Sequence, residues 1–413
     1  MSISSRIGPT VTVEGLERDP YPIYERLRAE EPVSWVESVG LWLVTRWDDV
    51  ERVDVNPNVF TGETEPSTLN RTFGRNMLGS EGPSHARIRS IVEPAFRPGA
   101  VRPYAAEVIE PIAHDLIDRF ADRGHVDLMP AFAEPLSVRT LQRVLGLSDV
   151  PVETLMRWFE QLGIGASNFE FDPGKQAIAD TASVEVDLTV DAILDRLASE
   201  PDGSILSRML HSEVDGQHLS RQEIGSNLKV MIVGGMQEPG DLIGIATWAL
   251  LTHAEQAAEV AADPGLVKPA VEEAMRWQSP VGTSTRQTTR TATLAGVDLE
   301  EGALIAAVVA SANRDERRWT DPNRFDIHRK QGAHLAFAIG PHHCIGAWLA
   351  RVESRAAIRA LFGRLPGLRL DDEHPIELHG WEFRRPMHLH VRWYPERNGT
   401  RTGLETSEDG QPD

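Results

Sequence analysis

Apolar residues recur at helical spacing along most of the chain. Two long stretches, His85 to about Leu210 and Arg221 to Trp277, carry apolar positions three and four residues apart, which predicts amphipathic helices. Shorter helices are predicted over Tyr21 to Glu31, after Asp19-Pro20, and from about Ile345 to Phe362. The pattern therefore favours a mostly α-helical protein.

Strand-like patterns are short and scattered. Leu41 to Arg46, Thr291 to Leu294 and Leu304 to Val309 are rich in apolar or β-branched residues, and Pro375 to Trp393 alternates around Gly380 and Pro386. Thr61 to Glu81 is rich in Gly, Thr, Asn and Pro, which predicts a long loop. Loops of this length inside a compact domain tend to be functional. A minor sheet component is expected beside the helices.

Composition favours a single large domain. The chain has 413 residues, 41% of them hydrophobic, and no Gly/Ser-rich linker or charge run divides it. Residues 1–396 are expected to form the domain, and the polar segment 397–413 is expected to be a disordered tail. The formal net charge of −20 argues against nucleic acid or an anionic membrane as partner.

A single cysteine excludes an intramolecular disulfide and a zinc ribbon. The N-terminus shows no signal-peptide pattern, and the longest apolar runs, such as Ala303 to Ala312, have half the length of a membrane span. A soluble, cytoplasmic protein is expected.

Cys344 is the main candidate for chemistry. It lies in the sequence Phe337-Ala338-Ile339-Gly340-Pro341-His342-His343-Cys344-Ile345-Gly346, just before a predicted helix. The N–H groups and dipole of a helix start favour a thiolate, and Gly340 permits a positive φ that turns N–H groups toward the sulfur. Phe337 could keep the sulfur dry. An inert buried cysteine, the usual fate of a lone Cys, and a metal site with His342 and His343 are the alternatives.

This segment matches the heme-binding signature of the cytochrome P450 family at Phe337, Gly340, His342, Cys344 and Gly346, with Ala338 where glycine is common. The resemblance extends from Asp19-Pro20-Tyr21 to Trp393. It implies a mainly α, single-domain cytochrome P450 fold, an α-helical bundle with a smaller β-rich region. It also implies heme b with Cys344 as the thiolate ligand of iron, and a monooxygenase that inserts one atom of O2 into a substrate.

The family also carries a Glu-x-x-Arg pair, which resembles Glu273 and Arg276 here, 71 residues before the cysteine. The same spacing at Glu25/Arg28 and Glu382/Arg385 is expected to give surface pairs. Arg324 belongs to a segment that resembles the family's Pro-x-Arg-Phe element. The resemblance implies a buried structural network of Glu273, Arg276 and Arg324.

Four further residues resemble the family's contacts to the two heme propionates. They are His85 and Arg89, four residues apart on a helix, Arg286, and His342.

The helix over the heme departs from the usual pattern of an acid followed by an alcohol. Gln237 and Glu238 occupy these two positions in the segment Val233 to Gly240. In most members this pair relays the protons needed to break the O–O bond, so the resemblance makes Gln237 and Glu238 the catalytic candidates. Gly234, Gly235 and Pro239 predict a broken helix with room beside the heme. Two polar residues at a proline kink are the alternative.

The string Gln237-Glu238-Pro239-Gly240 resembles the bacterial guaiacol O-demethylase branch, as do Asn70 to Gly74, Val92 to Ala95 and Gly380 to Arg384. This likeness implies O-demethylation of a small methoxylated aromatic to a phenol and formaldehyde. It also implies an apolar substrate pocket, in which Phe171 fits nearly as well as Phe169; the pocket residues are Phe73, Phe169, Val233, Gly234, Val281, Thr283 and Phe383.

Other readings stay open: a hydroxylase of a terpenoid, fatty acid or polyketide, a peroxide-driven peroxygenase, or a non-catalytic heme sensor. The chain has no Gly-rich nucleotide motif and no multi-Cys iron–sulfur motif. Electrons are therefore expected from NAD(P)H through a separate partner, a flavin or iron–sulfur reductase or a ferredoxin, which docks on basic side chains near Cys344.

Overall fold

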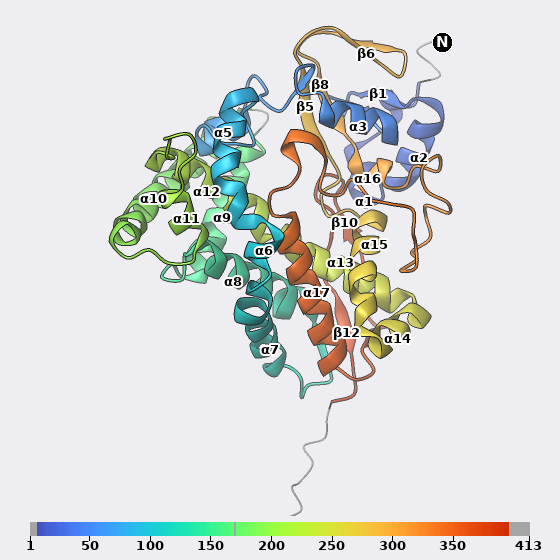
Figure 1. Ribbon diagram of the computed structural model, residues 1–413. Coiled ribbons are helices and arrows are strands. Elements are labelled where there is room, and N and C mark those ends of the chain that lie inside the picture. Colours follow the sequence, from blue (N-terminus) through green and yellow to red (C-terminus); the bar gives the residue numbers. More distant parts are fainter. Residues whose placement is uncertain (1–5, 169–170, 396–413) are drawn as a thin grey trace, which may run out of the picture.

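Helices occupy one side of the molecule and small sheets the other (Figure 1). The structure is a computed structural model and describes residues 6–168 and 171–395. The predicted tail, 397–413, lies outside the described residues. Among the described helices, none is long and apolar enough to cross a membrane.

The helices, in chain order, are α1 (Val13–Arg18), α2 (Tyr21–Glu30), α3 (Trp47–Val55), α4 (Thr68–Phe73), α5 (Gly82–Val92), α6 (Pro98–Val101), α7 (Glu110–Asp118), α8 (Glu134–Leu145), α9 (Val152–Ala166), α10 (Pro173–Ser199), α11 (Ile205–His211), α12 (Arg221–Met236), α13 (Glu238–Thr252), α14 (Ala254–Ala262), α15 (Val267–Trp277), α16 (Val309–Ala312) and α17 (Ala347–Arg364). Turns of π-helix at Ala105–Ile109 and Met129–Ala133 lead into α7 and α8.

The strands are β1 (Val33–Val36), β2 (Leu41–Val44), β3 (Phe60–Thr61), β4 (His125–Asp127), β5 (Ser284–Thr288), β6 (Ala292–Leu294), β7 (Val297–Leu299), β8 (Leu304–Ala307), β9 (Arg369–Leu370), β10 (Leu378–His379), β11 (Arg385–Pro386) and β12 (His390–Arg392). The largest sheet has the order β1-β2-β8-β5-β3, and the other sheets are β4-β12-β9, β10-β11 and β6-β7.

α17 passes through the middle of the molecule, with α5 to α12 on one side and the five-stranded sheet on the other (Figure 1). Its small buried residues, among them Ala356 and Ala357, allow close packing against neighbouring helices. The largest apolar cluster joins the helices α5 to α12 to α17 and β12. The loop before α17 is thereby held on the most rigid part of the protein.

The break between α12 and α13 has a local cause. α12 begins with a capping box, in which Ser220 and Glu223 satisfy each other's backbone N–H groups. It ends at Met236 because Pro239 lacks the N–H that would continue the helix, and α13 starts at Glu238. The predicted interruption of this helix is confirmed.

Several predicted elements differ from those observed. The segment Thr61 to Glu81 is not one loop, because Ser67 caps the short helix α4 within it. β5 was not expected, because its residues Ser284–Thr288 are polar and its buried side chain is Arg286. The predicted strand Leu304 to Val309 is wrong at its end, since β8 stops at Ala307 and α16 begins at Val309.

Candidate functional site

The loop before α17 is tightly folded around Cys344. The Cys344 N–H donates to the carbonyl of Phe337 at 2.9 Å, which closes the loop. Gly340 has a φ of 74°, and a Cβ there would lie 2.5 Å from the carbonyl oxygen of Asp54 on α3. Only glycine therefore fits this position, and the contact fixes the loop against α3.

Ala338 also adopts a left-handed conformation, with a φ of 51°. This region costs an L-residue about 1–2 kcal/mol and costs glycine nothing. The exchange of the family's glycine for alanine, which the sequence suggests is minor, thus places strain in the cysteine loop.

The sequence-based expectation that the pKa of Cys344 is lowered is wrong for the chain alone. Burial raises the pKa of the thiol, the Gly346 N–H lowers it, and the charge of Glu238 raises it further. α17 begins only at Ala347, so its dipole does not overcome the loss of water. A bound metal cation is the kind of group that deprotonates such a thiol outright.

The Cys344 thiol is surrounded by protein at longer range but is not covered by direct packing. On α12, Gly234 is likewise uncovered although its neighbours Ile232 and Met236 are buried, and a Cβ at Gly234 would meet nothing within 4 Å. Glu238 lies close enough to Cys344 for its charge to act on the thiol. Open space beside a thiol and a bare helix glycine is what a flat, iron-bearing macrocycle needs.

Glu238 carries an unsatisfied buried atom. Its Oε2 has no hydrogen-bond partner among the described residues, and burial raises the pKa of its carboxyl to about 8. Glu238 is therefore protonated at neutral pH and can donate a proton.

The neighbouring Gln237 is held by a residue that the sequence reasoning missed. Its Nε2 donates to Asp241 Oδ2 at 3.0 Å, and Asp241 Oδ1 lies 3.2 Å from Arg385 Nε on β11. Arg385 also pairs with Glu134 at the start of α8. Burial raises the pKa of Asp241 to about 7. Asp241 follows Gln237 by one helical turn, which is a signal in the sequence, whereas the partners 144 and 107 residues away give none.

The four predicted propionate contacts lie in one region. The rings of His85 and His342 are 4.5 Å apart, and the charges of both His342 and Arg286 act on Glu81. Arg286 Nη2 lies 3.2 Å from Asp54 Oδ1, and His342 Nε2 lies 2.9 Å from Glu81 Oε1. The two acids were not anticipated from the sequence.

His85 and Arg89 differ from simple cations. Burial, with the charges of His342 and Arg89, lowers the pKa of His85 to about 4, so that its ring is neutral and offers one N–H. Arg89 donates to the carbonyls of Pro341 and His343 at 3.0 and 2.7 Å and supports the loop. Two cations and a neutral donor fit the two carboxylates of a heme.

The predicted structural network needs one correction. Glu273 and Arg276 form a buried two-pronged pair, with both N–O distances 2.8 Å. Arg324 is exposed and contributes only its carbonyl, which accepts from Arg276 Nη2 at 3.1 Å. Arg329 Nε instead lies 3.1 Å from Glu273 Oε1 and is the third member. The turn at Asp321, with a φ of 45°, redirects the chain so that a later arginine faces Glu273.

Residues of the predicted substrate pocket are only partly brought together. Val281 and Phe383 form a β-bridge, and Val233 and Gly234 lie on α12. Phe73 is buried in the helical core and Phe383 is 52% exposed. Phe169 lies outside the described residues. Thr283, next to β5, is half-buried and follows the bridge.

Phe337 is half-buried, and Arg351 of α17 lies over its ring, with 4.4 Å from the guanidinium carbon to the ring centroid. The aromatic ring therefore sits between the loop and the proximal helix.

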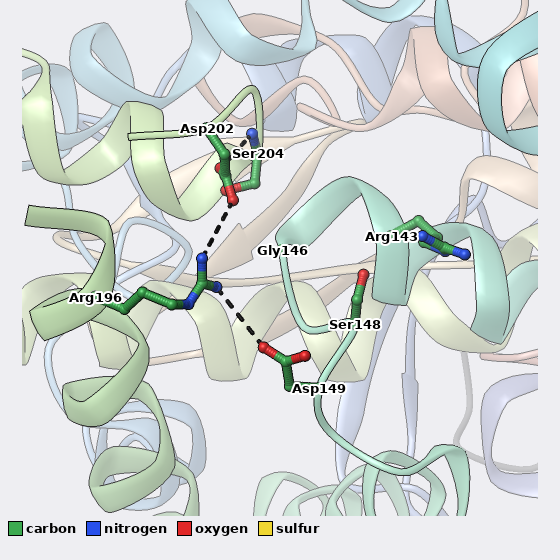
Figure 2. A pocket seen from close by; sticks show the side chains of 7 residues that line it. All are labelled: Arg143, Gly146, Ser148, Asp149, Arg196, Asp202 and Ser204. Carbon is green, nitrogen blue, oxygen red and sulfur yellow. Dashed lines mark hydrogen bonds and ion pairs between the residues drawn. The ribbon is translucent and has the colours of Figure 1, made fainter. Parts of the chain in front are cut away.

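A surface pocket between α8 and α10 is separate from this site (Figure 2). Arg196 there bridges Asp149 and Asp202 at 3.9 Å each, and none of the candidate site residues lines the pocket. Its own ion pairs fill it.

Comparisons with known proteins agree with the geometry. The family model described as "Cytochrome P450" matches residues 264–369. The chain is 34% identical over 378 residues to "Cytochrome P450 107B1" of Saccharopolyspora erythraea, covering 86% of this chain and 90% of that protein. It is 32% identical over 383 residues to "6-deoxyerythronolide B hydroxylase" of the same organism, covering 88% and 92%. Among solved structures, CalO2 matches with a TM-score of 0.85 at 31% identity, covering 94% of this chain and 98% of that one.

Proposed function

The chain belongs to the cytochrome P450 family and is a monooxygenase, and from this premise we propose how its residues serve the reaction and on what substrate. The family implies a heme with a cysteine thiolate on iron. The observation that carries the proposal is the uncovered Cys344 thiol beside open space, within electrostatic reach of the unpaired carboxyl of Glu238.

Cys344 would hold the iron of the heme, and Arg286, His342 and His85 would hold its propionates. When bound, the heme supplies the redox chemistry, in which O2 and two electrons give one oxygen atom to the substrate and one to water. The Phe337 ring and the folded loop keep water from the sulfur, which preserves its electron donation. The Glu273–Arg276–Arg329 network holds the chain that leads into this loop.

Glu238 would hold the proton that O–O cleavage requires. Its carboxyl stays neutral at pH 7 because burial raises its pKa to about 8. Asp241 would act as a positioning residue, since its carboxylate fixes the amide of Gln237 beside Glu238. The break at Pro239 leaves this turn without regular helix bonds and gives the substrate and water room.

The electrons would come from NAD(P)H through a separate redox partner. Arginines near the cysteine loop, including Arg89, Arg97 and Arg351, offer a basic surface for docking. This surface is positive within a chain of net charge −20, so an acidic partner would be steered to it.

For the substrate, we propose O-demethylation of a small methoxylated aromatic. Hydroxylation of the methyl carbon by O2, two electrons and two protons gives a hemiacetal and water, and the hemiacetal collapses to a phenol and formaldehyde. The Gln237-Glu238-Pro239-Gly240 turn, and the Val281–Phe383 bridge that presents an uncovered aromatic ring, support this substrate class.

The test uses the heme-loaded protein with guaiacol and related methoxyphenols, a reductase system and O2. Formaldehyde in equal amount to the phenol, together with a substrate-induced change in the heme spectrum, is expected. If no methoxyphenol gives either signal, the substrate proposal is wrong.

A second candidate substrate class is a macrolide ring. It is favoured by the 32% identical relative named 6-deoxyerythronolide B hydroxylase. Including a macrolactone in the same panel separates the two, because its hydroxylation releases no formaldehyde. Turnover with peroxide alone, at the rate of the reductase-driven reaction, would point to a peroxygenase.

A further inference from the structure

Three residues on the β4-β12-β9 sheet form a cluster of metal-ligand type. Asp127 of β4 and His390 of β12 are partners across the antiparallel pair, and His388 precedes His390 by two residues. Residues two apart on an extended chain share a face. Leu389 and Val391 alternate with them and are fully buried, so that His388, His390 and Asp127 gather on the outer face. The sheet itself thus sets their spacing.

The candidate ligand atoms face one another. His388 Nδ1 lies 2.7 Å and His390 Nε2 lies 4.0 Å from the same carboxylate oxygen, Asp127 Oδ2. All three ligand atoms lie within 4.8 Å of one another. Around a tetrahedral zinc ion, two ligands at 2.0–2.1 Å stand about 3.3 Å apart. Small rotations of the side chains would bring the three atoms to that separation, since His388 is 71% exposed and free to turn.

Asp127 is already oriented for this role. Its other oxygen, Oδ1, accepts the backbone N–H groups of Leu389 at 2.9 Å and Met129 at 3.2 Å. These two bonds leave Oδ2 for the imidazoles. Hydrogen bonds that fix the first ligands in this manner are typical of built metal sites.

Neighbouring groups support a cation rather than oppose it. The ring of His374 stacks on that of His390, with centroids 4.3 Å apart, and Asp371 Oδ2 lies 3.2 Å from His374 Nδ1. The charge of Arg392, the next residue on this face, is matched by Asp371 at 2.8 Å. His374 therefore stands beside the trio as a further imidazole.

We propose that Asp127, His388 and His390 bind a divalent transition-metal ion of the zinc class. Two imidazoles and one carboxylate suit zinc, copper or nickel rather than calcium or magnesium. The ion would join β12, near the end of the described chain, to β4, and is separate from the heme. Figure 1 shows β12 behind the lower end of α17, away from the cysteine loop that precedes that helix.

The test is Zn²⁺ titration of the heme-loaded protein, purified without a histidine tag, in competition with a chromogenic chelator. One Zn²⁺ per chain is expected. His388→Ala and His390→Ala should each weaken binding about tenfold or more. The matched control is His328→Ala, which removes an exposed imidazole paired to a single acid, Glu259, at 2.7 Å.

X-ray absorption at the zinc edge should show two nitrogen ligands from imidazole and at least one carboxylate oxygen. The proposal is overturned if wild type binds no Zn²⁺, or if His388→Ala retains the affinity of wild type. Equal losses in His388→Ala and His328→Ala would overturn it as well. The exposed position of His388 makes misfolding of its variant a poor explanation of loss, and an unchanged heme spectrum checks this.

Discussion

Replacing Glu238 by Gln keeps the size and shape of the side chain and removes its proton. The pKa of this carboxyl rises from 4.5 to about 8 because of burial. At about 1.4 kcal/mol for each pH unit, the rise corresponds to roughly 5 kcal/mol in favour of the neutral form. The folded protein therefore presents a protonated acid across the neutral range.

Two results follow for Glu238→Gln in the reductase-driven reaction. A general acid typically contributes about 10²- to 10⁴-fold, so product formation should fall by at least about 10²-fold while NAD(P)H oxidation continues and hydrogen peroxide accumulates. In wild type, product formation should be level below pH 8 and fall about tenfold per pH unit above it, because the donor is then ionised. The variant should lose this pH dependence.

Stability separates the proton's role from a structural effect. Because the folded pKa of Glu238 is raised, wild type should lose stability as pH rises from about 4.5 to about 8, and change no further above that. The variant, which has no proton to lose, should gain relative to wild type over the same window in thermal unfolding.

Glu353→Gln is the matched control. Glu353 lies on α17, and burial raises the pKa of its carboxyl to about 8 as well. It should show the same stability change without loss of product. The reasoning is refuted if Glu238→Gln keeps product formation within about threefold of wild type, since that is far below the loss of a general acid.

Three other variants test separate features. Ala338→Gly should stabilise the folded protein by about 0.5 kcal/mol or slightly more, because relief of about 1–2 kcal/mol of backbone strain exceeds the added entropy of the unfolded chain; urea unfolding of both proteins checks this, and a loss of stability would contradict it. Arg329→Ala should cost about 2 kcal/mol, since it removes a charged bond to buried Glu273, whereas Arg324→Ala should stay within about 0.5 kcal/mol; equal effects in thermal unfolding would be inconsistent with the observed network. Arg97→Glu should slow reductase-driven turnover several-fold at low salt and leave peroxide-driven turnover unchanged, and a parallel loss in both assays would exclude a docking role.

The helical content of the protein could be predicted from the sequence because it depends on local periodicity. α2, α12 and α17 lie where the apolar spacing places them, within about two residues at each end. β5 could not be predicted, because a strand of Ser, Thr, Arg and Gln is stabilised only by its neighbours β3 and β8.

The candidate site could be predicted where it depends on a short motif and not where it depends on distant partners. Cys344 and Glu238 are 106 residues apart, and only family resemblance joins them in sequence. The choice of Arg324 over Arg329 was wrong because both lie near the same motif, and the left-handed turn at Asp321 decides which one faces Glu273. Arg385 and Glu134, which fix Asp241, gave no signal because their contacts cross from β11 to α8 and α13.

The most direct test of the central claim is the absorption spectrum of the reduced, carbon monoxide-bound protein, recorded for wild type and for Cys344→Ala. Wild type should bind heme and show the red-shifted Soret band that a thiolate ligand produces. Cys344→Ala should lose that band, even where it still retains heme through Arg286, His342 and His85. A thiolate spectrum that survives in Cys344→Ala would contradict the assignment of Cys344 as the ligand.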